Sequence, residues 1–273
     1  MLRKQPGEGA SEISSNGCYH APMNIDLKGH LALVTGGSGQ LGRVMCRTLG
    51  DCGADVAVHY HQNRVSADGL VTELTGKGVR AMSVQADVTA EAEVRAMRQT
   101  VAAELGAPDI LVNNAVIQYT WVPVLEQALT DYESQFRSSV LHNVLMAQTF
   151  VPAMQERGWG RVIGINTECA MQNAPTQSAY VAGKRGMDGV LRVLAKEVGP
   201  QQITVNQVAP GWMISEDVPD GDEAAAYRAG VPLRRRGTDQ DIANLVAFLA
   251  SDLASFISGQ YISVSGGNVM PSI

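Results

Sequence analysis

The sequence has no excess of basic charge. Its 273 residues include 21 lysines and arginines against 27 aspartates and glutamates, which gives a formal net charge of -6 at pH 7. The longest basic run, residues 234–236, is too short to act as an arm that binds nucleic acid. We therefore expect no nucleic-acid partner.

Cysteine is scarce. The sequence has Cys18, Cys46, Cys52 and Cys169. None of them stands in the C-x-x-C or Cys/His spacing of a zinc site, and their scatter does not resemble a disulfide framework. We expect no bound metal and a reducing, cytoplasmic environment.

Long apolar runs are missing as well. No stretch approaches the ~20 apolar residues that a membrane span requires, so we expect no membrane partner. Residues 1–23 are rich in serine, glycine, proline and charge, and they hold no apolar run that could form a signal-peptide core. We predict a flexible tail over residues 1–26 and a single folded domain over residues 27–273.

From residue 30 onward, short strand-like runs alternate with stretches of helical periodicity. The predicted strands span residues 30–35, 56–60, 80–85, 110–113, 161–166, 204–208 and 261–264. The predicted helices span residues 41–50, 65–75, 91–105, 132–155, 178–198 and 239–251. Nearly continuous apolar strands are typical of a sheet that is covered on both faces. The sequence thus predicts an α/β fold, a doubly wound seven-stranded parallel sheet (Rossmann fold), with a substrate lid at residues 212–237.

A glycine-rich turn, Leu33-Val-Thr-Gly-Gly-Ser-Gly-Gln-Leu-Gly42, joins the first strand to the first helix. Gly36 would make the tight turn, Gly39 would let the backbone approach a pyrophosphate, and Gly42 would let helix and strand pack closely. A glycine-rich turn without a ligand is the alternative, although four glycines in seven residues weaken a helix start unless something needs the space. The predicted cofactor contacts of this turn are Gly36, Ser38, Gly39, Gln40, Leu41 and Gly42.

With several later motifs, this turn resembles the short-chain dehydrogenase/reductase family, and the resemblance extends from residue 27 to the C-terminus. Asp87-Val88 resembles the family's adenine contact, and the segment 113–116, Asn-Asn-Ala-Val, resembles its N-N-A-G. Pro210-Gly211 matches the P-G that follows the sixth strand, and residues 232–267 resemble the C-terminal run. The resemblance implies a compact, nicotinamide-dependent oxidoreductase. It also implies cofactor contacts at Asp87, Val88, Asn114, Pro210, Gly211 and Met213.

The sequence departs from the family pattern in the phosphate turn and near the end. Gln40 stands where the second glycine of T-G-x-x-x-G-x-G belongs, so the turn fits T-G-x-x-G-x-x-G instead. Ser215 replaces a common threonine, and Ser265 replaces a common aspartate. Gln40 is expected to alter the phosphate turn and its affinity for the cofactor.

The end of the second strand bears on the choice of cofactor. NAD-preferring relatives place an acidic residue there, which binds the ribose 2'-hydroxyl and repels a 2'-phosphate. This sequence has Tyr60 at that position, followed by His61, Asn63 and Arg64. We predict NADP, with contacts from Tyr60, His61 and Asn63. Arg64 either binds the phosphate or lies on a solvated helix turn, and NAD stays open.

Tyr180 and Lys184 form a candidate acid/base pair. Four residues apart in the predicted helix 178–198, they lie on one face of that helix. A tyrosine with an ordinary pKa of about 10 needs a nearby cation to act near neutral pH, and Lys184 supplies one. The resemblance implies that Tyr180 exchanges a proton with the substrate oxygen and that Lys184 also binds the nicotinamide ribose. Tyr180 and Lys184 are both predicted cofactor contacts as well.

The two other catalytic positions of the family are changed. Thr167 stands in place of the serine thirteen positions before the tyrosine, and its hydroxyl can still bond a substrate oxygen. Alignment of Pro152 and Gly160-Arg161 with their family counterparts puts Ser139 at the position of an asparagine. Asn143, one turn later, does not match that position. The predicted catalytic set is therefore Tyr180, Lys184, Thr167 and Ser139.

The leading hypothesis is an NADP-dependent oxidoreductase that interconverts a carbonyl and a secondary alcohol on a small organic molecule. A catalytically weak dinucleotide-binding sensor or partner subunit is the second hypothesis, and a non-redox proton-transfer enzyme of the same superfamily is the third. The resemblance implies a homotetramer, or a homodimer, built through the helices 132–155 and 178–198 and the last strand. Further candidates for lining the pocket are Gln118, Trp121, Cys169, Asn173 and Trp212.

Overall fold

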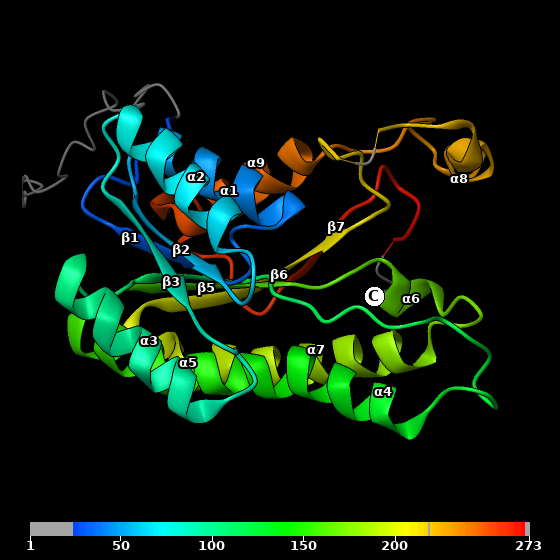
Figure 1. The fold of residues 1–273 in the computed structure, drawn as a ribbon, viewed down its shortest axis with the longest axis horizontal. Helices are drawn as coiled ribbons and strands as arrows, with labels where there is room; N and C mark the ends of the chain where they lie inside the picture. The colour runs from blue at the N-terminus through cyan, green and yellow to red at the C-terminus, as the bar shows by residue number, and fades with distance from the viewer. Residues whose placement is uncertain (1–23, 218, 271–273) are drawn as a thin grey trace, which may run out of the picture.

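A parallel sheet forms the centre of the computed structural model, which describes residues 24–217 and 219–270 (Figure 1). The strand order is β3-β2-β1-β4-β5-β6-β7, and all neighbouring strands are parallel. The strands are β1 (Leu31–Val34), β2 (Asp55–Tyr60), β3 (Ala81–Gln85), β4 (Ile110–Asn113), β5 (Gly160–Ile165), β6 (Ile203–Pro210) and β7 (Tyr261–Val264). The predicted seven-stranded parallel sheet is confirmed.

Helices cover both faces of this sheet (Figure 1). One face carries α1 (Gln40–Asp51), α2 (Arg64–Gly76) and α9 (Asp239–Ala250), and the other carries α3 (Glu91–Glu104), α5 (His142–Arg157) and α7 (Ser178–Val198). Neighbouring residues of β1 point to opposite faces of the sheet, and each face has its own apolar core. Val34 packs in one core with Met45 and Val246, and Leu33 packs in the other with Met146. The two cores explain why the strands read as continuous apolar runs.

The predicted helix 132–155 forms, but it extends further at both ends and contains a π-helical segment that was not predicted. The chain forms α4 (Leu129–Gln135), a π-helical segment η1 (Phe136–Leu141) and then α5. At this segment the Asn143 side chain donates a 2.7 Å hydrogen bond to the Ser139 carbonyl, and Asn113 donates to the Asn143 side chain at 2.8 Å. Apolar periodicity does not reveal a single widened turn of this kind, which is frequent at functional sites.

The segment 212–237 is largely irregular, but it contains a 3-10 turn, η3 (Asp222–Ala224), and a short helix, α8 (Ala225–Gly230). Another short helix, α6 (Cys169–Gln172), follows β5, and a 3-10 turn, η4 (Asp252–Ala254), follows α9. The sequence analysis missed these short elements, because runs of three to six residues carry too little periodicity.

A 3-10 turn, η2 (Gly199–Gln201), follows the end of α7, and the next residue, Gln202, has a left-handed backbone with φ of 60°.

Residues 1–23 of the predicted tail lie outside the described residues. Within the part of the chain that the structure describes, no helix combines the length and the apolar character needed to cross a membrane.

Candidate active site

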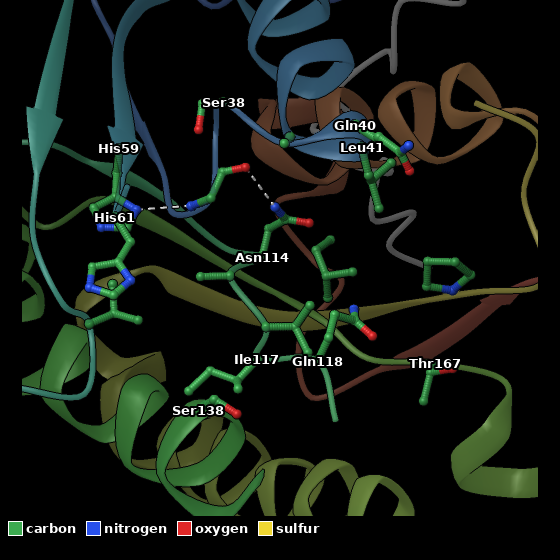
Figure 2. Close-up of a pocket in the computed structure, with 18 of the residues that line it drawn as sticks. Ser38, Gln40, Leu41, His59, His61, Asn114, Ile117, Gln118, Ser138 and Thr167 are labelled. Atoms are coloured by element: carbon green, nitrogen blue, oxygen red, sulfur yellow. Dashed lines mark hydrogen bonds between the residues drawn. The ribbon is translucent and has the colours of Figure 1, made fainter. Parts of the chain in front are cut away.

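A cavity of about 890 Å³ opens at the carboxyl ends of the central strands. This is the edge of an α/β sheet where ligands bind, next to the point where the chain order reverses between β1 and β4. Figure 2 shows part of its lining. Of the residues predicted from the sequence, the cavity is lined by Gly36, Ser38, Gly39, Gln40, Leu41, Gly42, His61, Asn63, Asp87, Val88, Asn114, Gln118, Thr167, Tyr180, Lys184, Pro210, Gly211, Trp212 and Met213.

The glycine turn needs its small residues. Gly36 has a φ of 63°, in the left-handed region that favours glycine. A Cβ on Gly42 would stand 2.1 Å from the Gly36 carbonyl oxygen, so α1 can begin this close to the strand only with glycine there. Gly39 is the N-cap residue, and no side chain caps α1. The first-turn N–H groups therefore fit an anionic group such as the pyrophosphate of a dinucleotide.

His59 on β2 supports this turn from behind. Its Nδ1 accepts a 2.9 Å hydrogen bond from the Gly36 N–H, drawn in Figure 2, and its Nε2 lies 2.9 Å from the Ala86 carbonyl oxygen. Burial lowers the pKa of His59 to about 4, so the ring is neutral at pH 7 and its proton lies on Nε2. The sequence analysis missed His59; its signal was a polar side chain at the carboxyl end of a buried strand.

Asn114 ties the end of β4 to the same turn. Its side-chain amide donates to the carbonyls of Thr35 at 3.0 Å and Gly36 at 3.3 Å, the latter drawn in Figure 2. Its backbone N–H donates to the Thr35 hydroxyl at 2.8 Å. Asn114, which the resemblance implied as a cofactor contact, therefore also shapes the floor on which the cofactor would lie.

The end of the cavity beyond β2 and β3 is lined by His61, Gln62, Asn63, Asp87, Val88 and Thr89. Tyr60 lies below this surface: its side chain packs in the apolar core and does not line the cavity. Arg64 is largely exposed, and its Nε lies 3.2 Å from Asp68. The alternation of side chains along a strand explains the difference, because Tyr60 faces the core of α1 and α2 while His59 faces the glycine turn.

Tyr180 and Lys184 meet at the cavity from α7. The Lys184 Nζ lies 5.8 Å from the centre of the Tyr180 ring and donates a 2.6 Å hydrogen bond to the Ile165 carbonyl. Burial lowers the pKa of Lys184 to about 8, and burial raises the pKa of Tyr180 to about 12. Burial thus outweighs the expected lowering of the tyrosine pKa by the lysine. At neutral pH the phenol holds its proton and the ammonium group keeps most of its charge.

Aromatic residues between β4 and α4 position Tyr180. The Tyr119 hydroxyl accepts the Tyr180 backbone N–H at 2.8 Å, which satisfies a donor in the first turn of α7. The rings of Trp121 and Tyr180 are stacked, with their centres 6.2 Å apart and 25° between their planes. Trp121 contacts the candidate catalytic ring without lining the cavity. The sequence analysis missed Tyr119, whose role depends on the path of a loop.

Thr167 lies at the cavity just beyond β5 (Figure 2). Its Oγ1 accepts the Cys169 N–H at 3.2 Å, and its own N–H donates to the Asn166 side chain at 2.9 Å. The Asn166 amide also donates to the Lys184 carbonyl at 3.1 Å. One side chain therefore fixes the backbones of Thr167 and Lys184 relative to each other. Cys169 and Asn173 do not line the cavity, and burial raises the pKa of Cys169.

Ser139 lies beneath the cavity and not in its wall. Its side chain is buried, and its Oγ has no hydrogen-bond partner among the described residues. It faces α7 at Gly183, where a Cβ would stand 3.2 Å from the Ser139 Oγ and 2.8 Å from the Gln135 carbonyl oxygen. The neighbouring Ser138 lines the cavity instead. A catalytic role of Ser139 stays a prediction.

No group of three or more His, Cys, Asp or Glu side chains that could hold a metal ion occurs among residues 24–217 and 219–270. The cysteines of these ranges, Cys46, Cys52 and Cys169, are free thiols. The residues present instead fit a nicotinamide dinucleotide. The glycine turn packs so closely on itself that a Cβ on Gly42 would meet the Gly36 carbonyl, and it leaves the first-turn N–H groups of α1 uncapped. The Lys184 ammonium group has a single protein acceptor, the Ile165 carbonyl, in the described part of the chain.

Comparisons with known proteins agree with this geometry. A family profile described as enoyl-(acyl carrier protein) reductase matches residues 38–268. A 3-oxoacyl-[acyl-carrier-protein] reductase of Staphylococcus epidermidis is 37% identical over 243 residues, which cover 88% of this chain and 98% of the relative. The chain belongs to the short-chain dehydrogenase/reductase family. This confirms the resemblance inferred from the sequence.

Two solved structures, one of them a short-chain dehydrogenase/reductase, are similar to this chain over about nine-tenths of its length. A double mutant of a Serratia marcescens short-chain dehydrogenase/reductase has a TM-score of 0.83 and 31% identity, and covers 89% of this chain and 98% of its own. A blue fluorescent protein from a metagenomic library, in complex with NADPH, has a TM-score of 0.83 and 35% identity, with 90% and 100% coverage. The protein is an NAD(P)-dependent short-chain reductase that acts on a carbonyl or alcohol group.

Proposed function

We propose that this short-chain dehydrogenase/reductase reduces a carbonyl group on a small, neutral organic molecule with NADPH, and that Tyr180 donates the proton. The observation that carries the proposal is the cavity itself. It brings a glycine-rich phosphate turn, a protonated, partly buried phenol and a buried ammonium group together at one edge of the sheet.

The chain's own residues divide the chemistry as follows. The first turn of α1 would hold the pyrophosphate, and Lys184 would bind the nicotinamide ribose. A reduced nicotinamide bound in this way would be the source of the hydride for the carbonyl carbon. Tyr180 delivers its proton to the carbonyl oxygen, and Thr167 donates a second hydrogen bond to that oxygen. The charge of Lys184 stabilises the phenolate that results. Proton donation of this kind typically contributes ~10²- to 10⁴-fold in rate.

The proposed preference for NADPH rests on the residues that follow β2. His61 and Asn63 line the cavity there, and the segment 60–64 has no carboxylate that would repel a 2'-phosphate. A gluconate 5-dehydrogenase from Burkholderia cenocepacia that binds NADP has a TM-score of 0.83 and 28% identity, with 90% coverage of this chain and 97% of its own. Isothermal titration calorimetry should give a lower Kd for NADPH than for NADH. A lower Kd for NADH would contradict the preference.

The proposed neutral substrate rests on the lining near Tyr180 and Thr167. Apart from Lys184, which is proposed to bind the nicotinamide ribose, the cavity lining includes Val116, Ile117, Gln118 and Trp212, of which none is charged. A charged substrate would meet no counter-ion among them, and burying an unpaired charge is costly. NADPH consumption should therefore be faster with neutral ketones and with neutral 3-oxoacyl thioesters than with keto acids of similar size. Faster turnover of the keto acids would contradict this proposal.

Assembly into a homotetramer, or a homodimer, is proposed from the family resemblance and from one surface. A groove of about 420 Å³ between α5 and α7 is lined mainly by apolar residues, and Val193 there is 56% exposed. A second copy of the chain would bury this face. Size-exclusion chromatography with light scattering should show a multimer, and Val193→Asp should yield smaller species. A wild-type monomer at micromolar concentration would contradict the proposal.

A further inference from the structure

A buried carboxyl group, that of Glu168, follows the candidate catalytic Thr167 in the chain. This residue lies just beyond the end of β5 and is 3% exposed. Its two oxygens accept hydrogen bonds from the Tyr227 hydroxyl at 2.8 Å and the Asn268 side-chain amide at 3.0 Å. Within the described ranges, no lysine, arginine or histidine forms an ion pair with Glu168. This side chain therefore binds neutral donors from two distant segments of the chain.

Tyr227 links Glu168 to Trp212, which lines the cavity. It belongs to α8 in the lid, and its hydroxyl accepts the Trp212 backbone N–H at 2.8 Å while donating to Glu168. The Tyr227 and Trp212 rings meet edge to face, with their centres 5.5 Å apart. A Cβ on Gly211 would stand 2.6 Å from the Tyr227 oxygen, so the backbone leaves room for this hydroxyl only because residue 211 is glycine.

Arg236 contacts both the ring and the backbone of Trp212. Its guanidinium group is buried, lies 4.5 Å from the centre of the Trp212 ring, and donates to the Trp212 carbonyl at 3.1 Å and to the Met213 carbonyl. Trp212 is thus fixed by its N–H through Tyr227 and by its carbonyl through Arg236. Trp212 itself lines the cavity.

We propose that Glu168 and Tyr227 are positioning residues that hold Trp212 in the wall of the substrate end, so that the lid is anchored to the segment between β5 and α6 that carries Thr167. The effect on substrate binding rests on the proposed function; the anchoring of Trp212 does not. Neither residue touches the reacting atoms. Both act through Trp212, and their loss should weaken substrate binding more than proton transfer.

Two variants distinguish the loss of these hydrogen bonds from a general loss of stability. Tyr227→Phe removes the hydroxyl, which leaves the Trp212 N–H and one Glu168 oxygen without partners. Glu168→Gln keeps an acceptor for Tyr227, and Asn268 can turn its amide so that its oxygen accepts from the new NH₂ group. Glu168→Gln should therefore behave nearly like the wild type.

The position of Trp212 can be measured by acrylamide quenching of its fluorescence. Trp121→Phe and Trp159→Phe leave Trp212 as the sole tryptophan. In this background Tyr227→Phe should make quenching steeper, and Glu168→Gln should not. The matched control is a protein with Trp159 alone, because this ring packs on His30, away from the lid. Quenching of Trp159 should not respond to Tyr227→Phe.

The kinetic measurement uses the native tryptophans and a neutral ketone. Tyr227→Phe should raise KM about tenfold, the expected cost of a buried Glu168 oxygen without its partner, and change kcat by less than about threefold. Unchanged quenching of Trp212 in Tyr227→Phe would overturn the anchor, and so would an equal rise at Trp159. If no carbonyl compound is reduced, the proposed function fails, while the quenching comparison still decides the anchor.

Discussion

Acid should destabilise this protein through His59. Its two ring nitrogens pair with the Gly36 N–H and the Ala86 carbonyl, so the fold requires the neutral ring with the proton on Nε2. A proton added to Nδ1 would face the Gly36 N–H and break the bond that supports the phosphate turn. Acidification therefore perturbs the turn and the stability of the fold together.

The magnitude follows from the two pKa values of this histidine. The pKa is about 4 in the folded chain and about 6.5 in an unfolded one. The contribution of neutral His59 is complete above about pH 6.5 and is lost as the pH falls toward 4. A difference of about 2.5 in pKa corresponds to about 3 kcal/mol of unfolding free energy. His142, buried and with a pKa lowered to about 3 by burial, should add a loss in the same direction.

Urea unfolding of the wild type and of His59→Gln between about pH 7.5 and 4.5 tests this effect. His59→Gln should be the less stable protein at pH 7.5, and its unfolding free energy should fall less steeply, by up to about 1.4 kcal/mol per pH unit. Gln62→Ala, which changes an exposed and uncharged side chain just beyond the same strand, should keep the wild-type slope. Equal slopes for the wild type and His59→Gln would refute the reasoning.

Four further substitutions have defined outcomes. Gly42→Ala places a Cβ 2.1 Å from a carbonyl oxygen of the turn, so calorimetry should show the Kd for NADPH raised at least about tenfold, and wild-type affinity would contradict the turn geometry. Gly183→Ala should lower the unfolding free energy by about 1–3 kcal/mol because α7 must move from η1, whereas Gly69→Ala, with open space around it on α2, should raise it by about 0.5–1 kcal/mol. If Gly183→Ala lowered the unfolding free energy by less than about 0.5 kcal/mol, the close approach of α7 to Gln135 and Ser139 would be wrong. Thr176→Gly should raise the Tm, since Thr176 has a φ of 73° that costs a β-branched residue about 1 kcal/mol or more; a lower Tm would contradict this.

Much of the fold could be predicted from the sequence because strand burial and glycine placement are local signals. Each observed strand lies within two residues of its predicted range, and the predicted helix 178–198 matches α7. The π-helical segment η1 within the helix 132–155 could not be predicted, because it involves the close approach to α7 at Gly183 and the Asn143 side chain.

The site was predictable where a motif fixes the backbone and unpredictable where a side chain acts across strands. The glycine turn, Tyr180, Lys184 and Thr167 all line the cavity. His59 and Tyr119 were missed because their partners, the Gly36 and Tyr180 N–H groups, lie 23 and 61 residues away in sequence. Ser139 was placed by register alone, and the structure puts it under the cavity.

The central claim is that Tyr180 donates the proton in carbonyl reduction, and Tyr180→Phe tests it most directly. With a neutral ketone and NADPH, kcat of this variant should fall by ~10²- to 10⁴-fold. The Kd for NADPH should stay within about twofold of the wild-type value, because the phenol is not needed to bind the pyrophosphate or the ribose. If Tyr180→Phe turns over the ketone at the wild-type rate, the assignment of Tyr180 is wrong.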